Sequence, residues 1–138
     1  MAIAHGALVW GIKASLLAYV RGMPDGAVAA SGGALETPGG FRFPAVGPLA
    51  FAGAVTLTGH HGMLRIVVAD PSIVEAAAGW ALEIADPDAP AGRLRFAALE
   101  CFDGASASGA ALTEDGADLF FGPYEAGTPL DIPRLERD

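Results

Sequence analysis

Short apolar segments alternate with polar or charged positions along most of the chain. Residues 51–57 carry Phe, Gly, Val and Leu at every second position, and residues 64–68 carry Leu, Ile and Val in the same way around Arg65. A period of two is typical of strands with one packed face. The sequence Gly-His-His-Gly at residues 59–62 separates the two segments. We therefore predict a β-hairpin with residues 59–62 at its tip.

Further strands are predicted where alternation recurs between turn residues. Arg93 and Arg95 flank Leu94 and Phe96, as on a sheet with one wet face and one packed face. Proline, glycine and aspartate mark the turns between these segments. The predicted strands cover residues 8–10, 41–43, 80–84 and 94–102; residues 110–113, 118–121 and 124–130 form short strands and loops, and residues 131–138 form a polar tail that frays.

One N-terminal segment, residues 10–21, has helical spacing instead. Ile12, Leu16, Tyr19 and Val20 suit one face of a helix of about ten residues, and Gly22 and Pro24 end it. A helix this short depends on tertiary packing for its stability. We therefore expect a mainly β, α+β fold: one domain over residues 1–138, built as a β-sandwich or open barrel with a single short helix.

Composition excludes several classes of partner. The 138 residues carry a net charge of −8, which repels nucleic acid and anionic membrane surfaces. No apolar stretch reaches the ~18 residues of a membrane span. Cys101 is the only cysteine, so no intramolecular disulfide forms, and we expect it to be a small buried side chain. No transmembrane or signal-peptide pattern occurs, so the chain as given is expected to be soluble and would be cytoplasmic, but the sequence leaves its compartment open.

Three residues are candidates for chemistry. Ser15 and Tyr19 are four positions apart, so a helix places both hydroxyls on one face. A deprotonated phenol is a hard oxygen donor that suits ferric iron, and a neutral imidazole from His60 or His61 could hold the phenol proton. The same residues also fit a surface tyrosine and a solvated turn. The residues alone leave both interpretations open.

Other chemistry has less support in the sequence. No Gly-x-Ser-x-Gly, GxGxxG or Walker A motif occurs. Cys101 has no linked histidine, and strand geometry points His60 and His61 to opposite sides, which makes a poor zinc chelate. The carboxylates at residues 86–88 and 114–115 lie in turn-like sequence and form no EF-hand loop.

Four segments, in order along the chain, carry a family resemblance. They are residues 8–20, 39–43, 55–71 and 122–131, with the sequences LVWGIKASLLAYV, GGFRF, VTLTGHHGML followed by ADP, and GPYEAGTPLD. Together they resemble the HtaA-type haem-binding domain, known from haem-uptake proteins of actinobacteria. The spacing between Tyr19 and His60 is shorter than in many relatives, so we expect trimmed loops around the pocket.

The resemblance implies a β-rich domain that binds one ferric haem b without catalysis, for uptake, transfer or storage. Matched motif to motif, Tyr19 is the axial iron ligand, Ser15 contacts a haem propionate, and His60 hydrogen-bonds the phenol oxygen, with His61 left open as a contact. Relatives are often exported or surface-anchored, and a homodimer or a second haem-transfer protein are the partners left open.

Two other functions remain as alternatives. One is a small peroxidase-like haem enzyme, for which only His61 or His5 could serve as the distal acid–base group. The other is a β-sandwich interaction module without haem. Apolar candidates for the haem slot are Phe41, Phe43 and Met63, each of which also fits a structural core.

Overall fold

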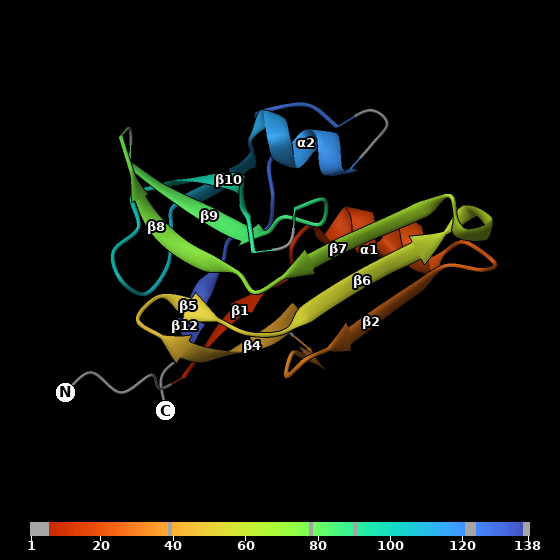
Figure 1. Cartoon of the computed structure of the whole chain (residues 1–138), viewed down its shortest axis with the longest axis horizontal. Helices are drawn as coiled ribbons and strands as arrows, with labels where there is room; N and C mark the ends of the chain where they lie inside the picture. The colour runs from red at the N-terminus through yellow and green to blue at the C-terminus, as the bar shows by residue number, and fades with distance from the viewer. Residues whose placement is uncertain (1–5, 39, 78, 90, 121–123, 137–138) are drawn as a thin grey trace.

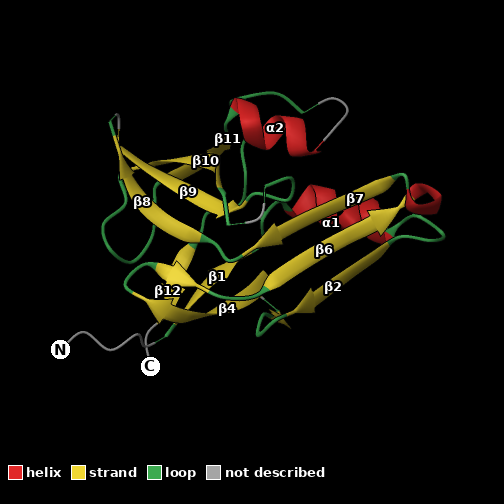
Figure 2. Ribbon diagram, in the orientation of Figure 1, coloured by secondary structure: helices red, strands yellow, loops and turns green. Residues whose placement is uncertain are grey.

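The computed structural model describes residues 6–38, 40–77, 79–89, 91–120 and 124–136. Antiparallel strands dominate it, as Figure 2 shows. The large, curved sheet contains β1 (Ala7–Trp10), β3 (Leu35–Thr37), β4 (Gly40–Gly47), β5 (Ala50–Phe51), β8 (Ser72–Ala76), β9 (Gly79–Ala85), β10 (Arg93–Glu100), β11 (Gly109–Leu112) and β12 (Arg134–Glu136). Its strand order is β11-β10-β9-β8-β5-β4-β1-β12, with β3 beside β4. The mainly β, α+β fold is confirmed.

A second sheet of three strands carries the predicted hairpin. It comprises β2 (Ala27–Ser31), β6 (Ala54–Gly59) and β7 (Leu64–Ala69), in the order β2-β6-β7. Strands β6 and β7 are antiparallel, and their pairing begins at the tip, where Gly59 lies opposite Leu64. The short 3₁₀ helix η1 (His60–Gly62) joins them. In Figure 1 this hairpin extends toward the right of the molecule, with η1 at its tip. The hairpin prediction is therefore confirmed.

Alternating side chains of the hairpin fill the core between the two sheets. Val55, Leu57, Ile66 and Val68 are fully buried, as their period of two predicts. The large sheet contributes aromatic side chains to the same core, including Trp10, whose ring meets that of Phe96 edge to face with centroids 5.7 Å apart. Apolar burial on this scale is the main source of stability.

Helix α1 (Ala14–Arg21) packs against β2 and β6 through one apolar face. Leu16, Leu17 and Val20 are buried, whereas Tyr19 is 54% exposed at the edge of this face. The expected helix begins too early, because Ile12 has a positive φ of 61° and lies before its first turn. Ile12 is nevertheless fully buried, as the apolar pattern predicts.

The start of α1 is held by the segment that returns at Asp131. The backbone carbonyl of Asp131 accepts a hydrogen bond of 2.7 Å from the Trp10 indole, and the Asp131 carboxylate accepts one of 3.2 Å from the N–H of Ala14. The N–H of Asp131 in turn donates to the carbonyl of Ile12 at 2.9 Å. The position of α1 therefore depends on a segment more than a hundred residues away.

A second helix, α2 (Glu114–Phe120), lies where we expect short strands and turns, so that expectation is wrong over 114–120. The hydroxyl of Thr113 accepts a hydrogen bond of 3.0 Å from the N–H of Gly116, as a helix N-cap does. Glycine is required there, because a Cβ would lie 2.2 Å from the carbonyl oxygen of Phe96. The expectation at Phe121 lies outside the described residues.

The polar tail also differs from the expected frayed end. Over 134–136 it forms β12, which pairs antiparallel with β1, Leu135 opposite Leu8. The Arg42 guanidinium and the Glu136 carboxylate lie 2.7 Å apart and join this strand to β4. Residues 137–138 lie outside the described part of the chain.

Cys101 is exposed, which contradicts the expected buried position. It directly follows β10 and has a positive φ of 41°, so it lies in the turn beyond the sheet. By contrast, Phe41 and Phe43 are buried core residues.

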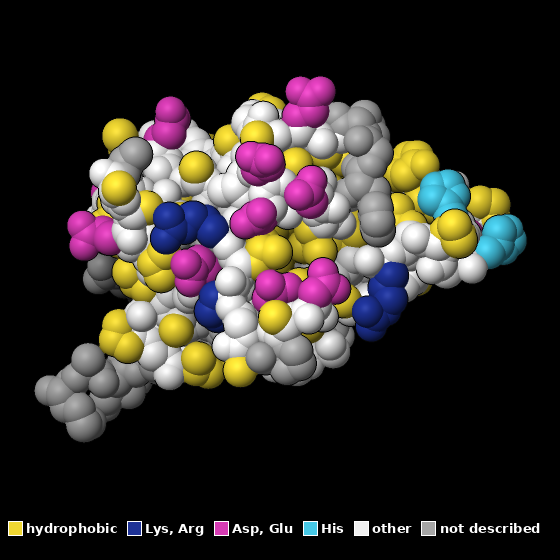
Figure 3. Space-filling view, turned by 45° about the horizontal axis from the view of Figure 1, so that its top comes forward, with side chains coloured by type: hydrophobic (Ala, Val, Ile, Leu, Met, Phe, Trp, Pro, Cys, Tyr) yellow, Lys and Arg dark blue, Asp and Glu magenta, His cyan; other side chains and the backbone are white. Residues whose placement is uncertain are grey.

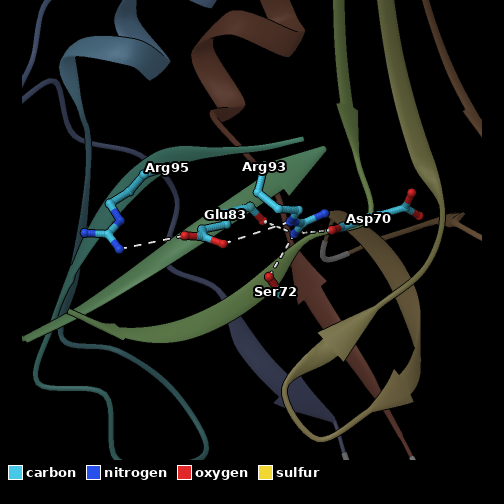
Figure 4. Close-up of polar contacts among 5 residues, drawn as sticks. All are labelled: Asp70, Ser72, Glu83, Arg93 and Arg95. Atoms are coloured by element: carbon cyan, nitrogen blue, oxygen red, sulfur yellow. Dashed lines mark hydrogen bonds and ion pairs between the residues drawn. The ribbon is translucent and has the colours of Figure 1, made fainter. Parts of the chain in front are cut away.

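Strands β8, β9 and β10 are further joined by polar contacts of Arg93 (Figure 4). Its guanidinium donates to the Asp70 carbonyl at 2.7 Å and to the Ser72 hydroxyl at 2.8 Å. Glu83 lies between Arg93 and Arg95, 4.0 Å and 3.8 Å away. The face of β10 that we predict to be solvent-exposed thus carries an ordered set of polar contacts. No helix in the described residues is long and apolar enough to cross a membrane.

Candidate functional site

Tyr19 is the large apolar residue of α1 that is exposed to solvent. Its position, one residue before the buried Val20, places the ring at the border between the packed and solvent faces of the helix. Ser15, one turn earlier, is also exposed. The helix therefore presents both hydroxyls on one accessible surface, as their spacing predicts.

The hairpin tip adopts a backbone conformation that is unusual for residues with side chains. His60 and His61 have φ values of 50° and 56°, both in the left-handed region, and Gly62 follows at 86°. Histidine is among the residues that enter this region more readily than most. The tight turn directs the two consecutive histidines to different neighbours, His60 to Tyr19 of α1 and His61 to the loop after this helix.

The structure brings His60 and Tyr19 into direct contact. Tyr19 Oη and His60 Nε2 are 3.0 Å apart and share a hydrogen bond, which the phenol donates when Nε2 carries no proton. The ring centroids are 6.1 Å apart, at an angle of 54° between the planes. Both side chains are exposed, so this polar pair is accessible to a ligand from solvent. It is also His60, and not its neighbour, that meets the tyrosine.

His61 contacts Asp25 instead. Its backbone N–H donates to Asp25 Oδ2 at 2.6 Å, while its ring Nδ1 lies 3.9 Å from the same oxygen and is almost fully exposed. The N–H of His61 lowers the pKa of the Asp25 carboxyl, because it hydrogen-bonds the charged form. Sequence reasoning missed Asp25, since a carboxylate after a proline in a loop carries no signal for a distant hairpin.

A second contact joins the same loop to the hairpin. The side chain of Met23 lies against Gly59, where a Cβ would approach the Met23 sulfur to 2.6 Å. Met23 is partly buried against the core, whereas Met63, beyond the tip, is 82% exposed. Figure 3 shows histidine side chains at one end of the molecule next to hydrophobic ones. The hairpin tip therefore carries both polar and apolar side chains.

The donor set indicates which kind of metal group fits. Within the described residues, no three His, Cys, Asp or Glu side chains gather to hold a bare ion. One phenol with a hydrogen-bonding imidazole can supply a single hard ligand, so the remaining coordination positions must come from the bound group itself. A ferric porphyrin meets this requirement. His5 lies outside the described residues.

Comparison with solved structures gives the same fold. The chain is 21% identical to the N-terminal domain of HtaA from Corynebacterium glutamicum, with a TM-score of 0.76 and coverage of 100% of this chain and 99% of that one. For the C-terminal domain of the same protein the identity is 24%, the TM-score 0.72 and the coverage 98% and 96%.

A histidine-to-alanine variant of that C-terminal domain, crystallised as a domain-swapped dimer, matches less closely. Its TM-score is 0.54 at 23% identity, over 99% of both chains. No curated protein is significantly similar to this chain in sequence. The HtaA family model, described as Htaa, matches residues 5–135. The chain therefore belongs to the HtaA family.

Proposed function

We propose that this domain binds ferric haem b without catalysing a reaction, and that Tyr19 is its axial iron ligand. The observation that carries the proposal is the hydrogen bond between the exposed Tyr19 phenol and His60 Nε2. Membership of the HtaA family, whose name is associated with haem uptake, supports the choice of haem. Haem would supply a ferric centre that accepts an anionic oxygen.

The proton of Tyr19 must leave for the phenol to act as an anionic donor. A free phenol has a pKa of about 10, so neutral pH leaves it protonated unless a neighbour favours the charged form. The His60 imidazole is placed to accept that proton at Nε2. It would then donate the same hydrogen to the phenolate oxygen, which fixes the oxygen's direction and moderates its basicity.

Ser15 and the apolar residues of the tip complete the proposed site. The Ser15 hydroxyl, one turn before the ligand on the exposed helix surface, suits a hydrogen bond to a carboxylate such as a propionate. Met63 offers an exposed apolar side chain next to the histidines, and Leu64 is only partly buried. The exposure of Tyr19 favours uptake or transfer, since haem can reach the phenol without unfolding of the domain.

A hemin titration with a matched control tests this proposal. The chain has two tyrosines, and Tyr124 packs its ring edge to face against Phe120, near Lys13 at the start of α1. We expect the absorption spectrum of a tyrosinate-ligated ferric haem in the wild type and in Tyr124→Phe, but not in Tyr19→Phe. His60→Ala should keep the ligand and weaken the affinity.

Three outcomes would contradict the proposal. The same spectrum in Tyr19→Phe would show that another residue binds the iron. An unchanged hemin spectrum in the wild type would favour an interaction module without haem. Rapid turnover of peroxide with a reducing substrate by the loaded wild type would instead favour the peroxidase-like enzyme.

A further inference from the structure

The loop between α1 and β2 contacts the hairpin tip that carries His60. Asp25 in this loop accepts the backbone N–H of His61 at 2.6 Å, and Met23 covers Gly59 on the other side of His60. Both residues directly adjacent to His60 are therefore held by one short loop. That loop also follows the helix on which Tyr19 lies.

The conformation of the tip makes such a contact necessary. Two consecutive non-glycine residues at φ values of 50° and 56° are each disfavoured in a free chain, so the turn needs an external contact to stay populated. A hydrogen bond to a carboxylate is stronger than one between neutral groups. The contact from Asp25 is thus well suited to select this conformation.

We propose that Asp25 is a positioning residue for His60: by accepting the His61 N–H, it fixes the turn that directs the His60 ring toward the Tyr19 hydroxyl. The consequence for haem rests on the function proposed above. The geometric part does not, since the Tyr19–His60 contact is made by two side chains of the chain itself.

The contact is made to a backbone N–H, so the proposal requires an acceptor at residue 25 more than it requires a charge. Asp25→Asn keeps an oxygen at the same distance from the backbone, whereas Asp25→Ala removes it. Asp103 provides a matched control, because it too accepts backbone N–H groups in an exposed loop, from Ala105 at 2.8 Å and from Ser106 at 2.9 Å. Its loop lies between β10 and β11, away from the hairpin tip.

The first readout is made on the protein without haem. Nuclear Overhauser effects between the rings of Tyr19 and His60 report their proximity, and the chain has only three histidines to assign. We expect these effects in the wild type, Asp25→Asn and Asp103→Ala, and their absence from Asp25→Ala. Asp25→Ala should keep the dispersed amide spectrum of a folded domain, because its side chain is exposed.

The second readout is the rate at which hemin passes to an excess of apomyoglobin. We expect Asp25→Ala to lose hemin about tenfold faster than the wild type, the factor that one hydrogen bond to a charged group can supply. Asp25→Asn should recover most of this difference, and Asp103→Ala should match the wild type.

Three results would overturn the inference: Overhauser effects between the two rings that persist in Asp25→Ala, their absence from Asp25→Asn as well, or equal hemin loss from Asp25→Ala and Asp103→Ala. Failure of the wild type to bind hemin would contradict the proposed function instead. The Overhauser effects in the haem-free protein would still test the role of Asp25 in that case.

Discussion

Replacing each tip histidine with glycine should separate the stability of the turn from its function. His60 and His61 both lie in the left-handed region, at φ values of 50° and 56°. Glycine enters this region without the steric cost that a Cβ brings, about 1 kcal/mol per residue. Each substitution should therefore stabilise the fold.

The two gains should differ in a way that the contacts predict. His61→Gly keeps the backbone N–H that donates to Asp25, so its gain should be about 1 kcal/mol. His60→Gly also removes the exposed hydrogen bond to Tyr19, worth about 0.5 kcal/mol, so its net gain should be about half as large. A gain of 1 kcal/mol corresponds to a rise in Tm of roughly 3–5 °C for a domain of this size.

Urea unfolding and hemin titration of both variants provide the assay. We expect His61→Gly to bind hemin as the wild type does and His60→Gly to bind it more weakly, although both unfold at higher urea concentration. A loss of stability in both variants would refute the argument from backbone strain. Equal hemin affinity in the two would refute the assignment of His60 as the partner of Tyr19.

Three further predictions concern packing, pH and redox state. Gly26→Ala should destabilise the fold by about 3 kcal/mol, because its Cβ would lie 1.7 Å from the carbonyl oxygen of Val20, whereas Gly47→Ala, with only a contact at 3.7 Å, should cost far less in urea unfolding. The backbone N–H of Ser106, with a second loop N–H, lowers the pKa of Asp103 from its ordinary value of 3.8. The stabilisation from the ionised Asp103 carboxylate is therefore present above its ordinary pKa and lost as the pH falls. Asp103→Asn should flatten the decline of the unfolding free energy below about pH 4, and an unchanged decline would contradict this. Reduction with dithionite should weaken haem retention in the apomyoglobin assay, since ferrous iron is a softer acid and prefers phenolate less; tighter retention would argue against a phenolate ligand.

The sequence predicts those elements whose patterns are local. The hairpin of β6 and β7 is predictable because both strands alternate and a Gly-His-His-Gly turn lies between them. Helix α1 is predictable from its apolar face and the glycine that ends it. The acidic start of α2 resembles a turn, and only the capping hydroxyl of Thr113 could have indicated a helix.

The candidate site is only partly local. Ser15 and Tyr19 share a surface through helical spacing alone, whereas the approach of His60 depends on how α1 packs against β2 and β6. The residues alone leave His60 and His61 open as partners of Tyr19, and the family resemblance favours His60. The contact between Asp25 and His61 joins a side chain to a distant backbone group, and no residue pattern encodes it.

The most direct test of the central claim is the resonance Raman spectrum of the hemin-loaded protein. Ring vibrations of an iron-bound tyrosinate should be enhanced in the wild type and in Tyr124→Phe, and absent from Tyr19→Phe. Their absence from the wild type, or their persistence in Tyr19→Phe, would contradict Tyr19 as the iron ligand.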